Sequence, residues 1–309
     1  MACKIVVIGS SNTDMVVKTE RIPAPGETML GGEFVMVPGG KGANQAVAAA
    51  RLGADVTFVA RVGDDAFGRT AIQNFEREGI NTSFIVTDPR AASGIALIIV
   101  DKNGENSIAV APGANMRLTP DDVLKARGAI EQADIVVLQF EVPMETVEAG
   151  VRLAKECGAK VLVNPAPAAK APPGILPMTD VLTPNRIEAA TLLNSSREED
   201  PSRLAGELLQ SGVGAAIITL GSDGVLIGQS GERGWIPAVK VDAVDTTAAG
   251  DAFTGALAVG LADGSDLKSA AQFAVYAAAA SVTRMGAQSS LPTREEVEKL
   301  IAKELLEGH

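Results

Sequence analysis

Six short runs of apolar, mostly β-branched residues constrain the fold of this chain more than any other feature. Their hydrophobicity is nearly continuous rather than alternating, which is typical of parallel strands covered on both faces. The runs occupy residues 4–8, 56–62, 134–138, 160–163, 180–182 and 216–220. Helical patterns lie between them at residues 118–132, 143–158 and 201–212. This alternation predicts right-handed βαβ units, and therefore an α/β fold with a doubly wound, mostly parallel sheet flanked by helices.

Two segments interrupt the alternation. Residues 12–38 carry no helical pattern and resemble short strands around a Pro/Gly turn at residues 23–26. Residues 93–113 hold Asn103-Gly104 between two apolar runs, which is a strong hairpin signal. The two segments predict a small accessory sheet within a single domain spanning residues 1–309. A sheet of this kind often acts as a lid over an active site.

The residue counts exclude several classes of function. The only histidine is His309, and the only cysteines are Cys3 and Cys157. Ser-His-Asp triads, His-ligated zinc and a disulfide framework are therefore not expected. We expect both thiols to stay reduced, as in the cytoplasm. The 27 basic and 38 acidic residues give a net charge of −11, which argues against a nucleic-acid partner. No apolar stretch approaches the roughly 20 residues of a membrane span.

The glycine-rich segment at residues 39–44 leads from an extended stretch into an Ala-rich helix. Glycines before a helix allow close approach of a ligand to the unpaired N–H groups of the helix N-terminus. Lys41 and Asn44 add side-chain donors at the same place. The segment matches neither the P-loop pattern nor the G-x-G-x-x-G pattern. A glycine-rich turn without a chemical role is the alternative interpretation.

The segment 245–256 places Asp251 in the first turn of an apolar helix, after the small residues 248–250. An acid at this position stabilises the helix dipole, which alone could explain it. The alternative is catalytic. Free N–H groups of the preceding turn could hold an anion while Asp251 accepts a proton, as phosphoryl transfer to a hydroxyl requires.

The two segments together, GGKGANQA at 39–46 and DTTAAGDAFTGA at 245–256, resemble the two signatures of the ribokinase-like (PfkB) carbohydrate kinases. Further motifs agree in order along nearly the whole chain, among them GSSNTD, PAPGET, NPAPA, TPNRIEA and TRMGAQSSLP. The resemblance implies a central α/β domain with a β-sheet lid. It also implies transfer of a phosphoryl group from ATP to the O5 hydroxyl of D-ribose, with Mg2+ accompanying ATP and K+ or another monovalent cation nearby.

The resemblance also implies roles for individual residues. Asp251 matches the catalytic base, and it touches the substrate. The backbone N–H groups of Ala248, Ala249 and Gly250 match the anion hole. The sugar-binding positions are Asn12, Asp14, Gly40, Lys41, Asn44 and Glu141. Position alone would instead make Glu141 an acid of a surface loop.

The nucleotide-binding positions implied by the resemblance are Asn185, Thr219, Gly221, Gly224 and Gly250, and Glu188 would organise Mg2+ through water. Asn185 and Glu188 also have the spacing of a helix capping box, and both roles can hold together. The monovalent-cation positions are Asp245, Thr247, Ser281, Arg284, Gly286 and Ser290. A turn-forming role is the alternative for Asp245.

Other functions stay open at this point. The substrate could be fructose, deoxyribose or a nucleoside, and a non-catalytic sugar- or nucleotide-binding protein is a further alternative. A dinucleotide-dependent oxidoreductase lacks its fingerprint here. We also expect a homodimer through the lid strands, because an apolar sheet face would otherwise be exposed. That face is predicted to carry Val16, Val17, Ile95, Leu97 and Ile99.

Overall fold

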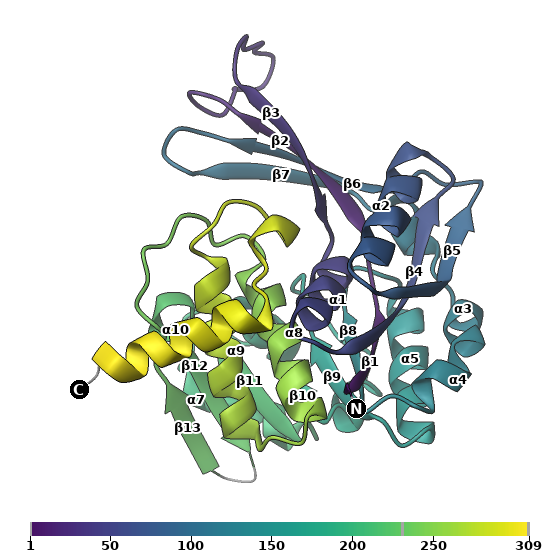
Figure 1. Cartoon of the computed structure of the whole chain (residues 1–309), viewed down its shortest axis with the longest axis vertical. Coiled ribbons are helices and arrows are strands. Elements are labelled where there is room, and N and C mark those ends of the chain that lie inside the picture. The colour runs from purple at the N-terminus through teal and green to yellow at the C-terminus, as the bar shows by residue number, and fades with distance from the viewer. Residues whose placement is uncertain (1, 230–231, 308–309) are drawn as a thin grey trace.

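The computed structural model describes residues 2–229 and 232–307, so His309 lies outside the described residues. A nine-stranded sheet runs through the body in the order β13-β12-β11-β10-β9-β8-β1-β4-β5 (Figure 1). Seven of its strands are parallel: β1 (Lys4–Ile8), β4 (Asp55–Gly63), β5 (Asn81–Asp88), β8 (Ile135–Gln139), β9 (Lys160–Asn164), β10 (Val181–Leu182) and β11 (Ala215–Thr219). An antiparallel pair, β12 (Val225–Gln229) and β13 (Glu232–Ile236), completes one edge.

All six predicted strands belong to the parallel part of the sheet, with ends within one residue of those expected. Their continuous hydrophobicity has the expected cause, because side chains of successive residues enter two different cores. On β1, Ile5 and Val7 pack into one core while Val6 and Ile8 pack into the other. The sequence patterns missed β5, β12 and β13, which lie at or near the two edges of the sheet.

Helices cover both faces of the sheet. One core lies beneath α1 (Lys41–Arg51), α2 (Ala66–Arg77), α8 (Ala249–Ala262), α9 (Leu267–Ser281) and α10 (Arg294–Glu307). The other lies beneath α3 (Pro120–Lys125), α4 (Arg127–Ile130), α5 (Met144–Glu156), α6 (Arg186–Leu193) and α7 (Pro201–Gln210). Short 3-10 turns form η1 (Gly113–Arg117), η2 (Leu176–Met178), η3 (Gly221–Asp223) and η4 (Gln288–Ser290).

The helix predicted at 118–132 is instead two helices, α3 and α4, separated at Ala126. Its start is as expected: Thr119 caps the helix in a reciprocal box with Asp122, ahead of Pro120. The break comes where the Ala126 N–H bonds the Val123 carbonyl at 3.0 Å, three residues back instead of four. This tighter bond changes the direction of the chain before α4 begins. The predictions for α5 and α7 are confirmed within two residues at each end.

Four strands form a separate, smaller sheet in the order β3-β2-β6-β7, and it extends away from the body (Figure 1). They are β2 (Asn12–Lys18), β3 (Glu33–Gly39), β6 (Gly94–Val100) and β7 (Asn106–Ala111). Asn103 and Gly104 lie in the β6–β7 connection, where Gly104 has a φ of 84°. At the base of this sheet, the Asn115 side chain accepts from the Ser11 N–H at 2.9 Å and donates to Asn12 Oδ1 at 2.7 Å.

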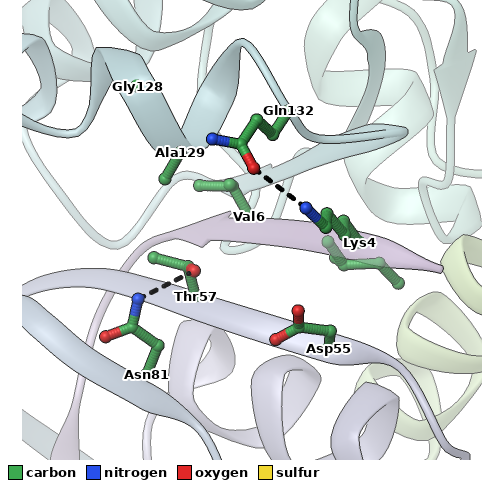
Figure 2. A pocket seen from close by; sticks show the side chains of 9 residues that line it. Lys4, Val6, Asp55, Thr57, Asn81, Gly128, Ala129 and Gln132 are labelled. Carbon is green, nitrogen blue, oxygen red and sulfur yellow. Dashed lines mark hydrogen bonds between the residues drawn. The ribbon is translucent and has the colours of Figure 1, made fainter. Parts of the chain in front are cut away.

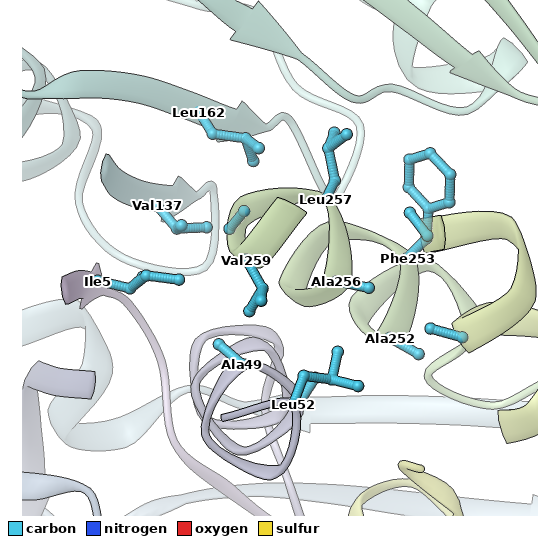
Figure 3. Packing of buried hydrophobic residues seen from close by; sticks show 14 of the residues in the cluster. Ile5, Ala49, Leu52, Val137, Leu162, Ala252, Phe253, Ala256, Leu257 and Val259 are labelled. Atoms are coloured by element: carbon cyan, nitrogen blue, oxygen red, sulfur yellow. The ribbon is translucent and has the colours of Figure 1, made fainter. Parts of the chain in front are cut away.

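Helices α1 and α8 approach each other unusually closely. A Cβ atom built on Gly255 of α8 would lie 2.6 Å from the Ala48 Cβ and 3.0 Å from the Gln45 carbonyl oxygen of α1. Figure 3 shows the two helices side by side, with Val259 of α8 next to Ala49 of α1 and with Ile5 and Val137 of the sheet beside them. This contact requires a residue without a side chain at position 255.

Two further properties of the described residues concern the thiols and the length of the apolar helices. Cys3 and Cys157 are both free thiols. Across residues 2–229 and 232–307, no helix is both long and apolar enough to cross a membrane.

We expect Gly255→Ala to destabilise the protein by about 1–3 kcal/mol, because the added methyl group overpacks the α1–α8 contact. Gly128→Ala is the matched control, because a Cβ at Gly128 meets no atom within 4 Å. Replacing a helical glycine in open space should leave stability unchanged or raise it by about 0.5–1 kcal/mol. Urea unfolding measures both variants. Equal stability of the two would contradict the proposed packing constraint.

Candidate active site

A cavity of about 230 Å³ opens at the carboxyl ends of the central strands. Asn164 ends β9, Thr183 follows β10, and Thr219 ends β11, and all three line it. This is the edge at which open α/β sheets bind ligands. The remaining lining comes mainly from α1, α6 and the start of α8, and the residues are Lys41, Ala166, Asn185, Glu188, Thr246, Ala248, Ala249, Gly250, Asp251 and Thr254.

The turn that begins α8 is strained and open. Ala248 has a φ of 61° and a ψ of 10°, a left-handed conformation that costs a residue with a side chain about 1–2 kcal/mol. The first bond of the helix runs from the Ala252 N–H to the Ala248 carbonyl at 2.8 Å. The N–H groups of Gly250 and Asp251 precede it, so they can meet an anion in the cavity. The Ala249 N–H donates to the Thr246 carbonyl at 3.2 Å in this conformation.

Asp251 lies at the centre of a hydrogen-bonded group, and its side chain is only 5% exposed. Asn44 Nδ2 donates to its Oδ2 at 2.9 Å, and Gln45 Nε2 donates to its Oδ1 at 2.9 Å. Both donors come from the first turns of α1, which the close α1–α8 packing brings next to the start of α8. The sequence motifs predicted Asn44 but not Gln45. The sequence signal that could have identified Gln45 was the presence of this polar residue within an Ala-rich helix.

The glycine-rich turn at 39–42 passes very close to the start of β2. A Cβ at Gly40, whose φ is 89°, would lie 2.7 Å from the Asn12 nitrogen, and one at Gly39 would overlap the Asp14 carboxylate. The turn therefore holds the predicted sugar-binding residues Asn12 and Asp14 beside Lys41. Glu141 joins the same group, because it accepts hydrogen bonds from the Ser10 hydroxyl and from the Lys41 N–H at 3.0 Å.

Electrostatics tie these residues to Asp251. Burial raises the pKa of Asp14 to about 6, and the nearby charges of Glu141 and Asp251 add to the effect. The charge of Asp251 is the main cause that raises the pKa of Lys41, and Glu141, Glu188 and Asp14 contribute as well. The Lys41 ammonium thus interacts electrostatically with four carboxylates, and two of them, Glu188 and Asp251, line the cavity with it.

Asn185 and Glu188 form the expected capping box at the start of α6. Asn185 Oδ1 accepts from the Glu188 N–H at 2.9 Å, and the Glu188 carboxylate accepts from the Asn185 N–H at 2.8 Å and from its Nδ2 at 2.9 Å. Burial raises the pKa of Glu188. Both side chains line the cavity beside Thr219, whereas Gly221 and Gly224 of the following turn do not.

The donor set fits Mg2+ carried by a phosphate ligand. Over the described ranges, 2–229 and 232–307, no three His, Cys, Asp or Glu side chains cluster in a way that could hold a metal ion. Asn185 and Glu188 offer oxygen atoms at the cavity wall, which suits an ion that keeps most of its water and phosphate ligands.

Asp245 joins the α8 turn to the loop that follows α9. Its Oδ1 accepts from the Thr247 N–H at 2.9 Å, and its Oδ2 accepts from the Gly286 N–H at 2.8 Å. Burial opposes its ionisation, but these hydrogen bonds hold the pKa of Asp245 below its usual value. In the same loop, Arg284 donates to the Ser290 carbonyl at 3.1 Å. The loop carbonyls and the Asp245 carboxylate are of the kind that bind a hard monovalent cation.

The hydroxyl groups predicted for the cation site are engaged locally. Ser281 Oγ donates to the Ala278 carbonyl at 2.8 Å, and Ser290 Oγ donates to the Ala287 carbonyl at 2.8 Å. The lone pairs of these hydroxyl oxygens can still accept or coordinate. The structure therefore brings the two halves of the predicted cation site together through Asp245.

A second cavity, of about 290 Å³, lies at the opposite, amino ends of the strands (Figure 2). Lys4, Asp55 and Asn81 begin β1, β4 and β5 there. Its polar groups pair with one another: Lys4 Nζ donates to Gln132 at 2.9 Å, and Asn81 Nδ2 to Thr57 at 3.3 Å. It holds none of the predicted site residues.

Comparison with known proteins agrees with this fold. Residues 2–294 match the pfkB family of carbohydrate kinases, and the chain belongs to that family. The ribokinase of Bacillus subtilis is 42% identical over 298 residues, which cover 96% of this chain and 99% of the relative. The deoxyribokinase of Salmonella typhi is 39% identical over 305 residues, covering 96% and 98%. The structure of Arabidopsis thaliana ribokinase complexed with ribose and ATP matches with a TM-score of 0.89 and 32% identity, covering 97% and 99%.

These findings confirm the resemblance read from the motifs. They also confirm the ribokinase-like α/β fold, with its large, mostly parallel sheet and a smaller separate sheet. The chain is accordingly a carbohydrate kinase. The comparisons do not support the alternatives of a dinucleotide-dependent oxidoreductase or a non-catalytic sugar- or nucleotide-binding protein.

We expect Asp14→Asn to stabilise the protein at neutral pH. The Asp14 pKa of about 6 exceeds its ordinary value of 3.8, so the folded state binds the proton more tightly than the unfolded state. The stability that this proton binding contributes is complete below about pH 4 and is lost as the pH rises through about 6. The stability advantage of the variant should therefore grow as the pH rises from about 4 to about 6 and be complete at neutral pH, as urea unfolding at each pH would show.

Asp88→Asn is the control of opposite sign, because hydrogen bonds from Arg117, Arg90 and Arg61 lower the pKa of Asp88. It should lose stability at neutral pH. A neutral-pH stability of Asp14→Asn equal to or below that of the unmodified protein would contradict the expectation.

Proposed function

We propose that the chain is an ATP-dependent ribose kinase that converts D-ribose to D-ribose 5-phosphate and ADP. One observation carries the proposal: Asp251 is buried next to the unpaired N–H groups of the α8 turn, and it lines the cavity together with Lys41 of the sugar-binding group. Ribokinases about 40% identical over nearly the whole chain support ribose as the substrate. Fructose, deoxyribose and nucleosides are the competing acceptors, and discrimination among such close analogues rests on about 1–3 kcal/mol.

In the proposed reaction, the Asp251 carboxylate takes the proton from the O5 hydroxyl as that oxygen forms a bond to the γ-phosphorus of ATP. The bond from phosphorus to the ADP oxygen breaks, and ADP leaves with its electron pair. N–H groups of the 248–250 turn stabilise charge on the phosphoryl oxygens. The residues that bind and orient the sugar hydroxyls are Asn12, Asp14, Gly40, Lys41, Asn44 and Glu141.

Asn185, Thr219, Gly221, Gly224 and Gly250 are assigned to the nucleotide in this proposal. Glu188, through water, would hold Mg2+, which offsets phosphate charge when it is bound. Asp245, Thr247, Ser281, Arg284, Gly286 and Ser290 are assigned to K+ or another monovalent cation, which would stiffen the turn before α8. The small sheet, built from residues 12–38 and 93–113 of this single domain, would close over the sugar and exclude water. We place the enzyme in the cytoplasm, which its free thiols at Cys3 and Cys157 support.

Asp251→Asn should reduce turnover by about 10²–10⁴-fold, because the amide cannot accept the proton. Ribose binding, measured by calorimetry, should stay within a few-fold. The assay follows ADP release from MgATP with D-ribose, with and without K+, beside fructose, deoxyribose and adenosine. Turnover that depends on ribose and rises with K+ is the expected result for the unmodified enzyme.

Asp266→Asn is the matched control, because Asp266 caps α9 by accepting from the Ser269 N–H at 2.9 Å. It removes a helix-capping acid at a distance from the cavity and should leave turnover unchanged. Retained high activity in Asp251→Asn would refute the base assignment. ADP release with another acceptor alone would keep the kinase mechanism and refute ribose as the substrate.

We further propose that the chain forms a homodimer through the small sheet. Alternation along the strands places Val17, Leu97 and Ile99 on the face away from Asp14, together with Phe34 and Met36 of β3. Ile95 shares this face, but Val16 lies on the same face as Asp14, which corrects the grouping expected from the sequence. Phe34 is 59% exposed and Leu97 is 50% exposed, which makes the face an apolar liability in a monomer.

Sedimentation at micromolar concentrations should therefore show a dimer. Leu97→Glu should shift it to a monomer, because the charge would be buried at the interface. Leu306→Glu on α10, at a side chain that is 80% exposed, should leave the dimer intact. A monomer at all concentrations would refute this proposal without affecting the kinase assignment.

A further inference from the structure

Behind Asp251 lies a chain of buried side-chain amides to which neither the family resemblance nor the proposed reaction assigns a role. Gln45 of α1 has no exposed surface, and its Nε2 reaches both Asp251 Oδ1 at 2.9 Å and Asn164 Oδ1 at 3.1 Å. Its Oε1 accepts from Gln139 Nε2 at 2.6 Å. Asn164 Nδ2 continues the chain by donating to the Thr183 carbonyl at 2.8 Å.

The direction of every amide in this chain follows from its two ends. The Thr183 carbonyl can only accept, so Asn164 must turn its Nδ2 towards it and present its Oδ1 to Gln45. An ionised Asp251 can also only accept. Gln45 must therefore present its Nε2 to both neighbours, which leaves its Oε1 to accept from Gln139. The orientation of Gln45 is thus fixed by its surroundings and has no alternative flip of equal quality.

Gln45 and Asn44 hold Asp251 in different ways. Asn44 lies at Oδ2, and in the described part of the chain its own Oδ1 has no hydrogen-bond partner although it is buried. Asn44 can therefore turn towards a sugar hydroxyl and release Oδ2. Gln45 is enclosed on every side and bonded at both ends of its amide, so it keeps hold of Oδ1.

We propose that Gln45 is a positioning residue for the proposed kinase reaction, with Gln139 fixing Gln45 in turn. The inference rests on the proposed function, in which Asp251 is the base. A carboxylate rotates about its final bond, and a permanent donor at Oδ1 aims Oδ2 at the incoming hydroxyl. The two oxygens thereby take different roles, since Oδ1 is anchored in the protein and Oδ2 faces the substrate. Orientation errors of about 1 Å can cost about 100-fold in rate.

Gln45→Met removes the donor at nearly constant volume and tests the proposal. We expect kcat to fall by about 10–100-fold, because Asp251 loses its fixed orientation. The ribose KM and the calorimetric ribose affinity should stay within about three-fold, because Gln45 does not face the sugar. A purely structural role would lower thermal stability without this division between kcat and KM.

A double-mutant cycle tests the chain itself. Gln139→Met should lower kcat less than Gln45→Met, and the double variant should be no slower than Gln45→Met, because Gln139 acts only through Gln45. Gln139→Met also serves as the milder variant if Gln45→Met folds poorly. Thr146→Val is the matched control, since it removes a fully buried hydroxyl that bonds the Leu118 carbonyl at 2.7 Å, under the other face of the sheet. Its kcat should not change.

The possible failures are distinguishable. A folded Gln45→Met enzyme with kcat within two-fold of the unmodified enzyme would overturn the proposal while leaving the kinase function intact. Additive losses in the double variant would overturn the role of Gln139. If the unmodified protein turns over no acceptor, the proposed function fails, and a crystal structure of Gln45→Met then decides this inference. An Asp251 carboxylate that rotates or becomes disordered supports positioning, and an unmoved carboxylate overturns it.

Discussion

The close packing of α1 against α8 is the contact on which the rest of the site depends. Because Gly255 has no side chain, the α1 backbone can approach α8 to van der Waals distance. At larger separation, Asn44 and Gln45 would not reach the Asp251 carboxylate with their short amide groups. The two helices come from opposite ends of the chain, so no local sequence pattern can impose this distance. The sheet imposes it, because both helices pack into the same core above β1 and β8.

Four carboxylates lie close together in the site, and their negative charge limits which ligands the site can bind. Asp14, Glu141, Glu188 and Asp251 surround one ammonium group, that of Lys41. Burial already raises the pKa values of Asp14 and Glu188, so each further negative charge is resisted. A nucleoside triphosphate that binds in the cavity would bring further negative charge close to these carboxylates. Backbone N–H groups at the start of α8 and cations bound with the phosphates can offset this charge, because neither brings a further negative group into the site.

The sequence predicted the centre of the fold better than its edges. Strands such as β1 and β8 are buried on both faces, so their apolar runs are unmistakable. The hairpin of β12 and β13 lies at the sheet edge, where Glu232, Arg233 and Gly234 break the apolar run. The separation of α3 from α4 was missed because it depends on one hydrogen bond at Ala126 that spans three residues instead of four. In the site, the two motifs located Asp251 and Asn44, but the role of Gln45 arises from tertiary contacts with Gln139 and Asn164.

The chain path divides the site into a part carried by the small sheet and a part fixed in the body. Asn12 and Asp14 lie on β2, whereas Lys41, Asn44 and Gln45 lie on α1, which begins directly after the strand β3. Gly40, with its φ of 89°, is the junction between β3 and α1, and Ser11 and Asn12 are held at the other junction by Asn115. Movement of the small sheet about these junctions would change the distance from Asn12 and Asp14 to Asp251. It would leave the Gln45–Asp251 bond unchanged, because both residues are anchored in the core. The orientation of the base can thus be set before the sugar is enclosed, and it need not be rebuilt each time the sheet closes.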